Sequence, residues 1–120
     1  MYRIVKQMEV SSSHCLSLPY SSKCANPHGH NWLIEVHVSG LELNSYGMLI
    51  DFSHISQVVN KLDHVVLNNV LMDGDKPINP TAENIARWIA RNIQKLCGEH
   101  IYVDKVVVKE CEGNTAIWEL

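Results

Sequence analysis

Polar and apolar residues alternate along two segments near the start of the chain, residues 2–16 and residues 28–40. The even-numbered side chains of the first segment are mostly apolar, with Lys6 as the exception, and His14 extends the same face. The even-numbered positions of the second segment run from two histidines into an apolar stripe, whereas most odd-numbered positions are polar. Because successive side chains of a strand point to opposite faces, both segments are predicted to be strands with one buried face.

Two later segments, residues 51–68 and residues 81–98, repeat apolar residues with the 3.6-residue period of an amphipathic helix. In the second segment Glu83 lies in the first turn, where the helix dipole favours a carboxylate. Side chains that accept hydrogen bonds from a first turn, and a glycine that ends a helix, mark the boundaries. The expected boundary residues are Asp51 or Ser53, Thr81 and Gly98.

The rest of the chain supplies two loops and two further strands. Residues 17–27 and 69–80 are rich in proline and turn-forming residues and are predicted to be loops. Residues 101–110 and 115–120 are predicted to be strands joined by a turn at residues 111–114. The element order is therefore ββααββ, which predicts an α+β fold with an antiparallel four-stranded sheet and both helices on one face.

The composition is that of a single globular domain, residues 1–120, with 46% hydrophobic and 19% charged residues. The formal charge of −3 and the lack of a Lys/Arg run argue against nucleic acid as a partner. No apolar stretch approaches the ~20 residues that span a bilayer, so no membrane partner is expected. The N-terminus lacks the pattern of a signal peptide, and the four cysteines lack CxxC spacing. We therefore expect reduced thiols and a cytoplasmic location.

His28 and His30 are the first candidates for chemistry, because an H-x-H pair on a strand projects both imidazoles to one side. His14, predicted at the end of the neighbouring strand on the same face, would join them if the two strands form a hairpin. Three nitrogen ligands with an open fourth position are typical of catalytic zinc. The alternative interpretation is two polar residues at a frayed strand end and a hydrogen-bonded core histidine.

A thiol, a carboxylate and an imidazole are further candidates. Cys24 lies four residues before His28, where a nearby cation would favour the thiolate as a ligand or base. Asp63 and His64 are adjacent at the predicted end of the first helix, and a carboxylate there could orient an imidazole for proton transfer. A buried inert cysteine, and a histidine favoured at a helix C-terminus beside a solvated aspartate, are the alternatives. For Asp63 and His64 the sequence alone favours the second of these alternatives, a histidine at a helix C-terminus beside a solvated aspartate.

Glu110 shares a predicted strand face with Val106 and Val108, near the strand end. Its two oxygens could accept two parallel N–H donors from a guanidine-like edge of a ligand. A partly exposed terminal glutamate is the alternative interpretation.

Six segments occur in the order typical of the 6-pyruvoyltetrahydropterin synthase and 6-carboxytetrahydropterin synthase family, which this chain resembles over nearly its whole length. They are SSSHCL, KCANPHGHNW, GMLIDFSHI, LDHVVLN, NPTAENIARWI and VVVKECEGNTAIW. The resemblance implies the tunnelling fold and a Zn²⁺ ion held by His14, His28 and His30. It also implies assembly as a homohexamer of two face-to-face trimers, with the pterin bound between subunits.

The same resemblance implies roles for the other candidates: Cys24 as the general base, Asp63 and His64 as its proton relay, and Glu110 as the pterin anchor. Cys111 departs from the threonine that many relatives have after this glutamate. Only three residues separate Cys24 from His28, which is similar to the carboxy type of the queuosine pathway. The implied reaction converts 7,8-dihydroneopterin triphosphate to 6-carboxy-5,6,7,8-tetrahydropterin, with release of acetaldehyde and triphosphate.

Two other functions stay open at this point. One is a pyruvoyl-type synthase, which would release triphosphate from the same substrate but give 6-pyruvoyltetrahydropterin. The other is a non-catalytic, zinc-stabilised module that uses the fold only for assembly. The second alternative leaves Glu110 and the LDH segment without a role.

Overall fold

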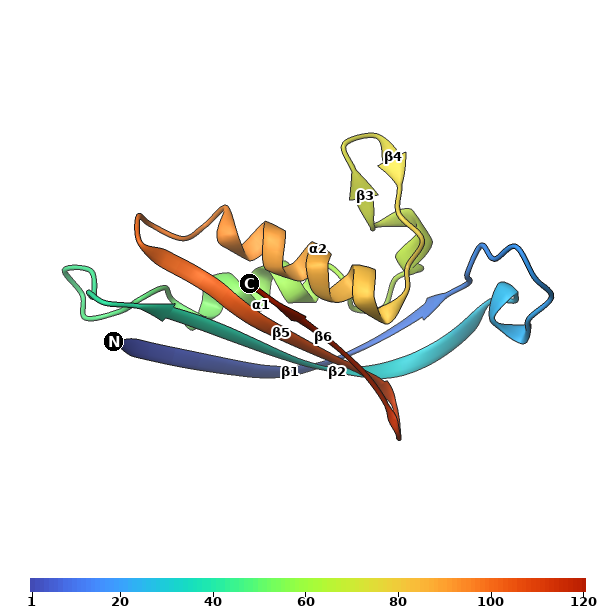
Figure 1. The fold of residues 1–120 in the computed structure, drawn as a ribbon, viewed down its shortest axis with the longest axis horizontal. Helices are drawn as coiled ribbons and strands as arrows, with labels where there is room; N and C mark the ends of the chain where they lie inside the picture. The colour runs from blue at the N-terminus through green and yellow to red at the C-terminus, as the bar shows by residue number, and fades with distance from the viewer.

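The computed structural model describes residues 1–120 as a four-stranded antiparallel sheet with two helices on one face (Figure 1). Along the sheet the strands lie in the order β1-β2-β5-β6. The predicted α+β fold class is confirmed. The strands are β1 (Tyr2–His14), β2 (His28–Gly40), β5 (Ile101–Cys111) and β6 (Asn114–Glu119), and the helices are α1 (Phe52–Asn60) and α2 (Ala82–Gln94).

The long hairpin of β1 and β2 has the alternation that the sequence predicts. Val10 of β1 lies opposite Trp32 of β2, and both side chains are buried. At the far end of the same ladder His14 lies opposite His28. The register thus places the end of the apolar stripe of β1 opposite the start of the apolar stripe of β2.

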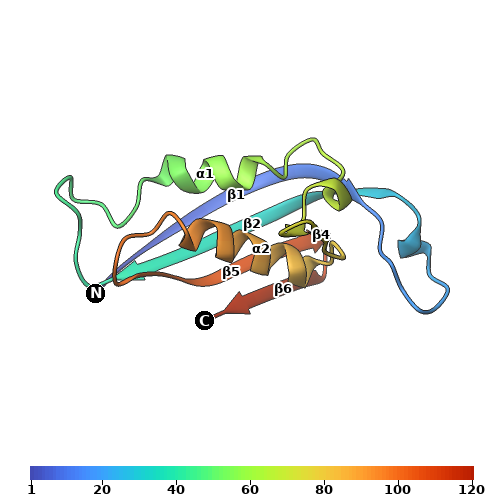
Figure 2. The ribbon, with the colours of Figure 1, turned by 90° about the horizontal axis from the view of Figure 1, so that it is seen from above.

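The helices cover this stripe side by side, α1 over β1 and α2 over β5 and β6 (Figure 2). Asp51 and Thr81 cap them, each accepting a backbone N–H of the first turn. Gly40 ends β2 in close contact with Ile101 and Leu49. A Cβ there would lie 2.6 Å from Cδ1 of Ile101 and 3.0 Å from Cδ2 of Leu49, so only glycine fits without a shift.

Three predictions about element boundaries are wrong. Helix α1 ends at Asn60 rather than near residue 68, and the short 3₁₀ turn η2 (Leu67–Asn69) follows. Helix α2 ends at Gln94, with Lys95 as its C-cap in helical geometry, so Gly98 does not end it. The loop after η2 contains a small hairpin of β3 (Met72–Asp73) and β4 (Lys76–Pro77), which rises beside α2 (Figure 1).

The predicted loop between β1 and β2 contains one 3₁₀ turn, η1 (Lys23–Ala25), and projects past the helices at one end of the molecule (Figure 1). The opposite face of the sheet carries no helix. Neither helix has the length and apolar character needed to cross a membrane.

Candidate metal centre

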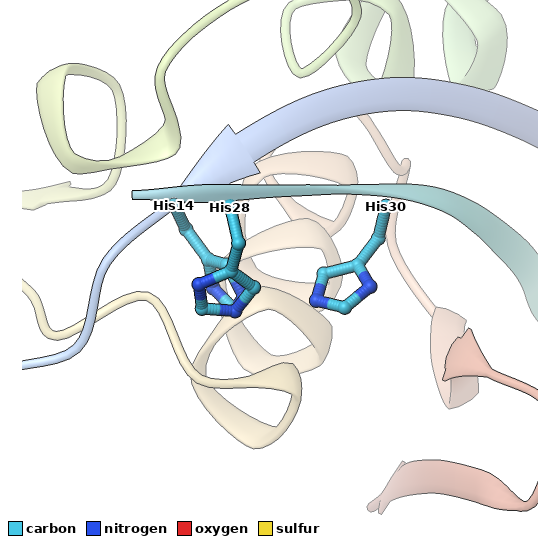
Figure 3. Close-up of side chains that lie close together, drawn as sticks. All are labelled: His14, His28 and His30. Carbon is cyan, nitrogen blue, oxygen red and sulfur yellow. The ribbon is translucent and has the colours of Figure 1, made fainter. Parts of the chain in front are cut away.

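Three imidazoles from two strands converge at one end of the sheet, on the face that the helices cover (Figure 3). The ring centroids of His14 and His28 are 4.4 Å apart, and that of His30 lies 5.2 Å and 5.0 Å from them. One potential ligand atom from each residue lies within 4.8 Å of the others. The β1–β2 register produces this cluster, because it places the end of β1 against the start of β2.

Backbone carbonyls fix the orientation of two of these rings. Nδ1 of His14 lies 2.7 Å from the carbonyl oxygen of Pro80, and Nδ1 of His28 lies 2.7 Å from that of Asn26. A carbonyl oxygen only accepts hydrogen bonds, so each Nδ1 carries the proton and each neutral ring presents an Nε2 lone pair. This arrangement is common for histidines that bind metals.

The site also holds buried nitrogen atoms without partners. Nε2 of His14 and Nε2 of His30 are both buried and make no hydrogen bond. Burial lowers the pKa of both imidazoles below the ordinary histidine value, and the nearby ring of His28 lowers it further. Neutral rings with free lone pairs are what a divalent cation requires, so the three residues fit a metal ion.

Glu110 adjoins this cluster, with its Oε1 atom 3.3 Å from Nε2 of His30. This contact is not a hydrogen bond, so Nε2 of His30 has no hydrogen-bond partner. The β5–β6 register shifts between Lys109 and Cys111, and Glu110 lies at this irregularity. Glu110 continues the face of the buried residues Val106 and Val108, so strand alternation places its carboxylate on the side of the sheet that carries the histidines.

Cys24 lies in η1, half-buried, on the loop that returns the chain to β2. The backbone N–H of Leu16 donates to the Cys24 carbonyl at 2.8 Å, and the Cys24 N–H donates to Oγ of Ser22 at 3.1 Å. No hydrogen bond joins its thiol to the three histidines. Within one chain, therefore, the structure fixes the backbone of Cys24 without linking its side chain to the cluster.

Two asparagine side chains hold the segment that precedes this loop. The amide of Asn68 exchanges two hydrogen bonds with the backbone of Cys15, at 3.0 and 2.8 Å. The amide of Asn79 does the same with the backbone of Ser17, at 2.9 and 3.0 Å. Both amides satisfy backbone groups that a neighbouring strand would otherwise pair. Leu16, which lies between the two bonded residues, donates its N–H to the Cys24 carbonyl.

Asp63 and His64 lie in the turn after α1, on the free edge of β1. Oδ1 of Asp63 accepts the N–H of Ser11 at 2.9 Å, and Nδ1 of His64 lies 2.9 Å from Oδ2 of Asp63. Both bonds lower the pKa of the Asp63 carboxyl below its ordinary value, and the bond from Ser11 has the larger effect. The His64 side chain is 82% exposed and makes no hydrogen bond to the three histidines.

The sequence indicates the histidines, the thiol and the carboxylates as candidates, but it does not indicate the groups that orient them. Nothing in the local pattern distinguishes Asn68 or Asn79 from ordinary loop asparagines, and a carbonyl such as that of Pro80 carries no sequence signal. The sequence left open whether Asp63 and His64 bond each other, and the structure joins them. This bond requires the turn that replaces the predicted helix end.

Comparison with known proteins gives consistent matches over nearly the whole chain. The family model described as 6-pyruvoyl tetrahydropterin synthase matches residues 3–119. A putative 6-carboxy-5,6,7,8-tetrahydropterin synthase of Pyrococcus abyssi is 37% identical, over 90% of this chain and 83% of that protein. A dihydroneopterin monophosphate aldolase of Pyrococcus furiosus is 35% identical, over 78% and 75%.

A solved structure supports the same fold. The 6-pyruvoyl tetrahydropterin synthase of Caenorhabditis elegans is similar with a TM-score of 0.76 and 22% identity, over 99% of this chain and 95% of that one. At this identity the likeness bears on the fold alone.

Proposed function

The chain belongs to the 6-pyruvoyl tetrahydropterin synthase family, and from this membership we propose that it is a zinc-dependent 6-carboxy-5,6,7,8-tetrahydropterin synthase. The substrates are 7,8-dihydroneopterin triphosphate and water, and the other products are acetaldehyde and triphosphate, in the queuosine pathway. The observation that carries the proposal is the convergence of His14, His28 and His30 beside Glu110, with Nε2 of His14 and of His30 buried and without a hydrogen-bond partner. The similar relative from Pyrococcus abyssi supports the carboxy type.

In this proposal the three histidines hold the zinc ion through nitrogen. Bound there, zinc supplies Lewis-acid chemistry that polarises oxygen atoms of the substrate side chain. The carbonyls of Pro80 and Asn26 hold the rings of His14 and His28 in the tautomer that binds a metal. Their role is to keep the site arranged before the substrate arrives.

Glu110 anchors the pterin. A carboxylate accepts two parallel N–H bonds, and a pterin offers a ring N–H and an exocyclic amine on one edge. With Oε1 only 3.3 Å from His30, this anchor places the substrate side chain next to the histidines. Orientation of this kind makes a large contribution to rate, because the reacting groups are held together in advance.

Cys24, as the thiolate, removes a proton from the substrate side chain, and His64 carries protons onward while Asp63 orients its ring. In a single chain neither Cys24 nor His64 is hydrogen-bonded to the histidines. The exposed ring of His64 is accessible to a neighbouring subunit. We therefore place the complete active site between subunits.

A homohexamer of two trimers is the assembly that fits this proposal. Strand β6 is an edge of the sheet, and most of β1 is the other edge. Exposed apolar side chains on or near the open face include Val5, Leu33 and Ile117. Pairing of open edges between copies satisfies backbone groups that otherwise invite unspecific association.

The pyruvoyl-type reaction is the alternative enzymatic function, and the description of the family model keeps it open. Relatives with similar sequence identity to this chain are named for different reactions, so identification of the product is needed to distinguish them. A non-catalytic zinc module is the alternative from another class. It predicts that Cys24 is dispensable and that chelation unfolds the protein.

The test is incubation of the zinc-loaded protein with 7,8-dihydroneopterin triphosphate, followed by assay of acetaldehyde and mass spectrometry of the pterin product. Acetaldehyde and 6-carboxytetrahydropterin in equal amounts support the proposal. A 6-pyruvoyl product without acetaldehyde supports the alternative synthase. Unchanged substrate with a fully loaded zinc site contradicts both.

A further inference from the structure

A polar pocket lies between the outer face of α2 and the β3–β4 hairpin. No step of the proposed reaction uses it. It has a volume of about 360 Å³. Its cationic side chains are Arg87, Arg91 and Lys95, and the hairpin contributes Asp73 and Gly74. None of the proposed catalytic or metal-binding residues lines it.

The helical period explains why the three basic side chains lie in one row. The inner face of α2 is apolar and buried, so residues four apart on the opposite side form one exposed row. Arg87, Arg91 and Lys95 lie along this row at a rise of about 6 Å per step. A reading of the sequence for runs of adjacent basic residues does not detect such a row, because three other residues separate each pair.

These three cations have no carboxylate partner. The ion pairs of the molecule join other residues, and Asp73 does not come within 4.0 Å of any of the three. Like charges four residues apart on a helix repel one another. A chain with a formal charge of −3 thus concentrates unpaired positive charge around one pocket, including two of its three arginines.

The remaining lining suits a phosphorylated ligand. Arginine presents a planar fork of N–H donors that matches phosphate oxygens, and Lys95 adds a point charge. Trp88 packs against the core and also lines the pocket, next to Asn84 and Asn92. An indole at this position offers a surface on which a base can stack.

We propose that this pocket binds an oligophosphate anion through Arg87, Arg91 and Lys95. The chemistry is shared by inorganic triphosphate and by nucleoside triphosphates. The proposal does not depend on the reaction assigned to the histidine cluster.

The experiment measures binding of inorganic triphosphate, ATP and GTP to the full-length, zinc-loaded protein by isothermal titration calorimetry at low ionic strength. The test variant is Arg87→Ala/Arg91→Ala. The control variant is Arg3→Ala/Lys61→Ala, which removes the same formal charge from residues that do not line the pocket.

We expect the test variant to weaken triphosphate binding at least tenfold and the control variant to change it less than threefold. We also expect affinity to fall as salt is added, since screening weakens exposed charges. Circular dichroism and the metal content of the test variant should stay native, because both arginines are exposed.

The nucleotide arms distinguish the source of the phosphate. Tighter binding of ATP or GTP, with fluorescence quenching that Trp88→Phe removes, assigns the pocket to a nucleotide. Equal affinities without quenching assign it to the phosphate chain alone. No measurable binding of triphosphate, or equal weakening in both variants, overturns the proposal. The variant His28→Ala is titrated in the same way. If it abolishes triphosphate binding while Arg87→Ala/Arg91→Ala leaves binding unchanged, the anion occupies the histidine cluster and the proposal is overturned.

Discussion

Nδ1 of His14 and the carbonyl oxygen of Pro80 lie 2.7 Å apart, although 66 residues separate them in the chain. The contact joins the last residue of β1 to the segment that leads into α2. It is buried, so the hydrogen bond is protected from competition with water. The orientation of a predicted metal ligand therefore depends on the placement of the segment that leads into α2.

Replacement of a cluster histidine should remove the metal. We expect His14→Ala and His28→Ala to lose bound zinc, since two nitrogen ligands do not retain the ion at a three-ligand site. Metal content per chain, measured by atomic emission after dialysis, checks this. His54→Ala, which alters an exposed histidine of α1, should retain one zinc per chain. Full zinc content in His14→Ala would rule out the cluster as the metal centre.

Glu110→Gln should weaken pterin binding while zinc stays bound. Hydrogen bonds that involve a charged group contribute about 1.5–3 kcal/mol, which corresponds to roughly 10- to 100-fold in affinity. Fluorescence titration with 7,8-dihydroneopterin measures the change. The control is Glu112→Gln, because the Glu112 side chain is 96% exposed in the neighbouring turn. Equal affinity in wild type and Glu110→Gln would remove the anchor role.

Cys24→Ala should abolish turnover without loss of zinc. A general base contributes typically 10²–10⁴-fold, so a drop of this size in kcat is expected. Cys111→Ala, an exposed cysteine, is the matched control and should stay active. A Cys24→Ala protein with a near-native rate would show that another group acts as the base.

Asn68→Ala should alter both stability and the environment of Cys24. The change removes two hydrogen bonds to Cys15, and at about 0.5–1.5 kcal/mol each the loss is roughly 1–3 kcal/mol of unfolding free energy. Because Leu16 holds the Cys24 carbonyl, the alkylation rate of Cys24 should change as well.

Urea unfolding at fixed protein concentration and peptide-resolved mass spectrometry after brief iodoacetamide treatment measure these two effects. Asn69→Ala is the control, since its exposed side chain makes no hydrogen bond. A loss of stability with unchanged alkylation of Cys24 would limit Asn68 to a structural role.

The sequence predicts the strands of this fold better than the ends of its helices. Alternation over thirteen-residue strands is a repeated local signal, and it places Val10, Trp32 and the three histidines on the correct face. The pattern after Asn60 is also helical, but residues 63–66 pair with the free edge of β1 instead. His64 has φ of 55°, its N–H donates to Ser11, and Ser13 pairs with Val66. Hydrogen bonds to a distant strand override a local preference.

The candidate site divides along the same line. Residue type and spacing indicate the candidate groups, because only a few side chains bind metal or move protons. The carbonyl of Pro80 and the amides of Asn68 and Asn79 act through geometry that exists only in the folded chain.

Acid should weaken the attachment of the Asp63 turn to β1. The N–H of Ser11 and the ring of His64 lower the Asp63 pKa in the folded state, so the unfolded chain binds this proton more readily. The carboxylate therefore stabilises the fold above the unfolded pKa of about 3.9, and the contribution is lost as the pH falls through the lower folded value. Asp63→Asn should be less stable than wild type near neutral pH, with a difference that shrinks below about pH 4. Thermal unfolding from pH 3 to pH 7 measures this, with Asp75→Asn in the exposed hairpin turn as the control. A difference that stays constant over this range would show that the Asp63 charge does not hold the turn.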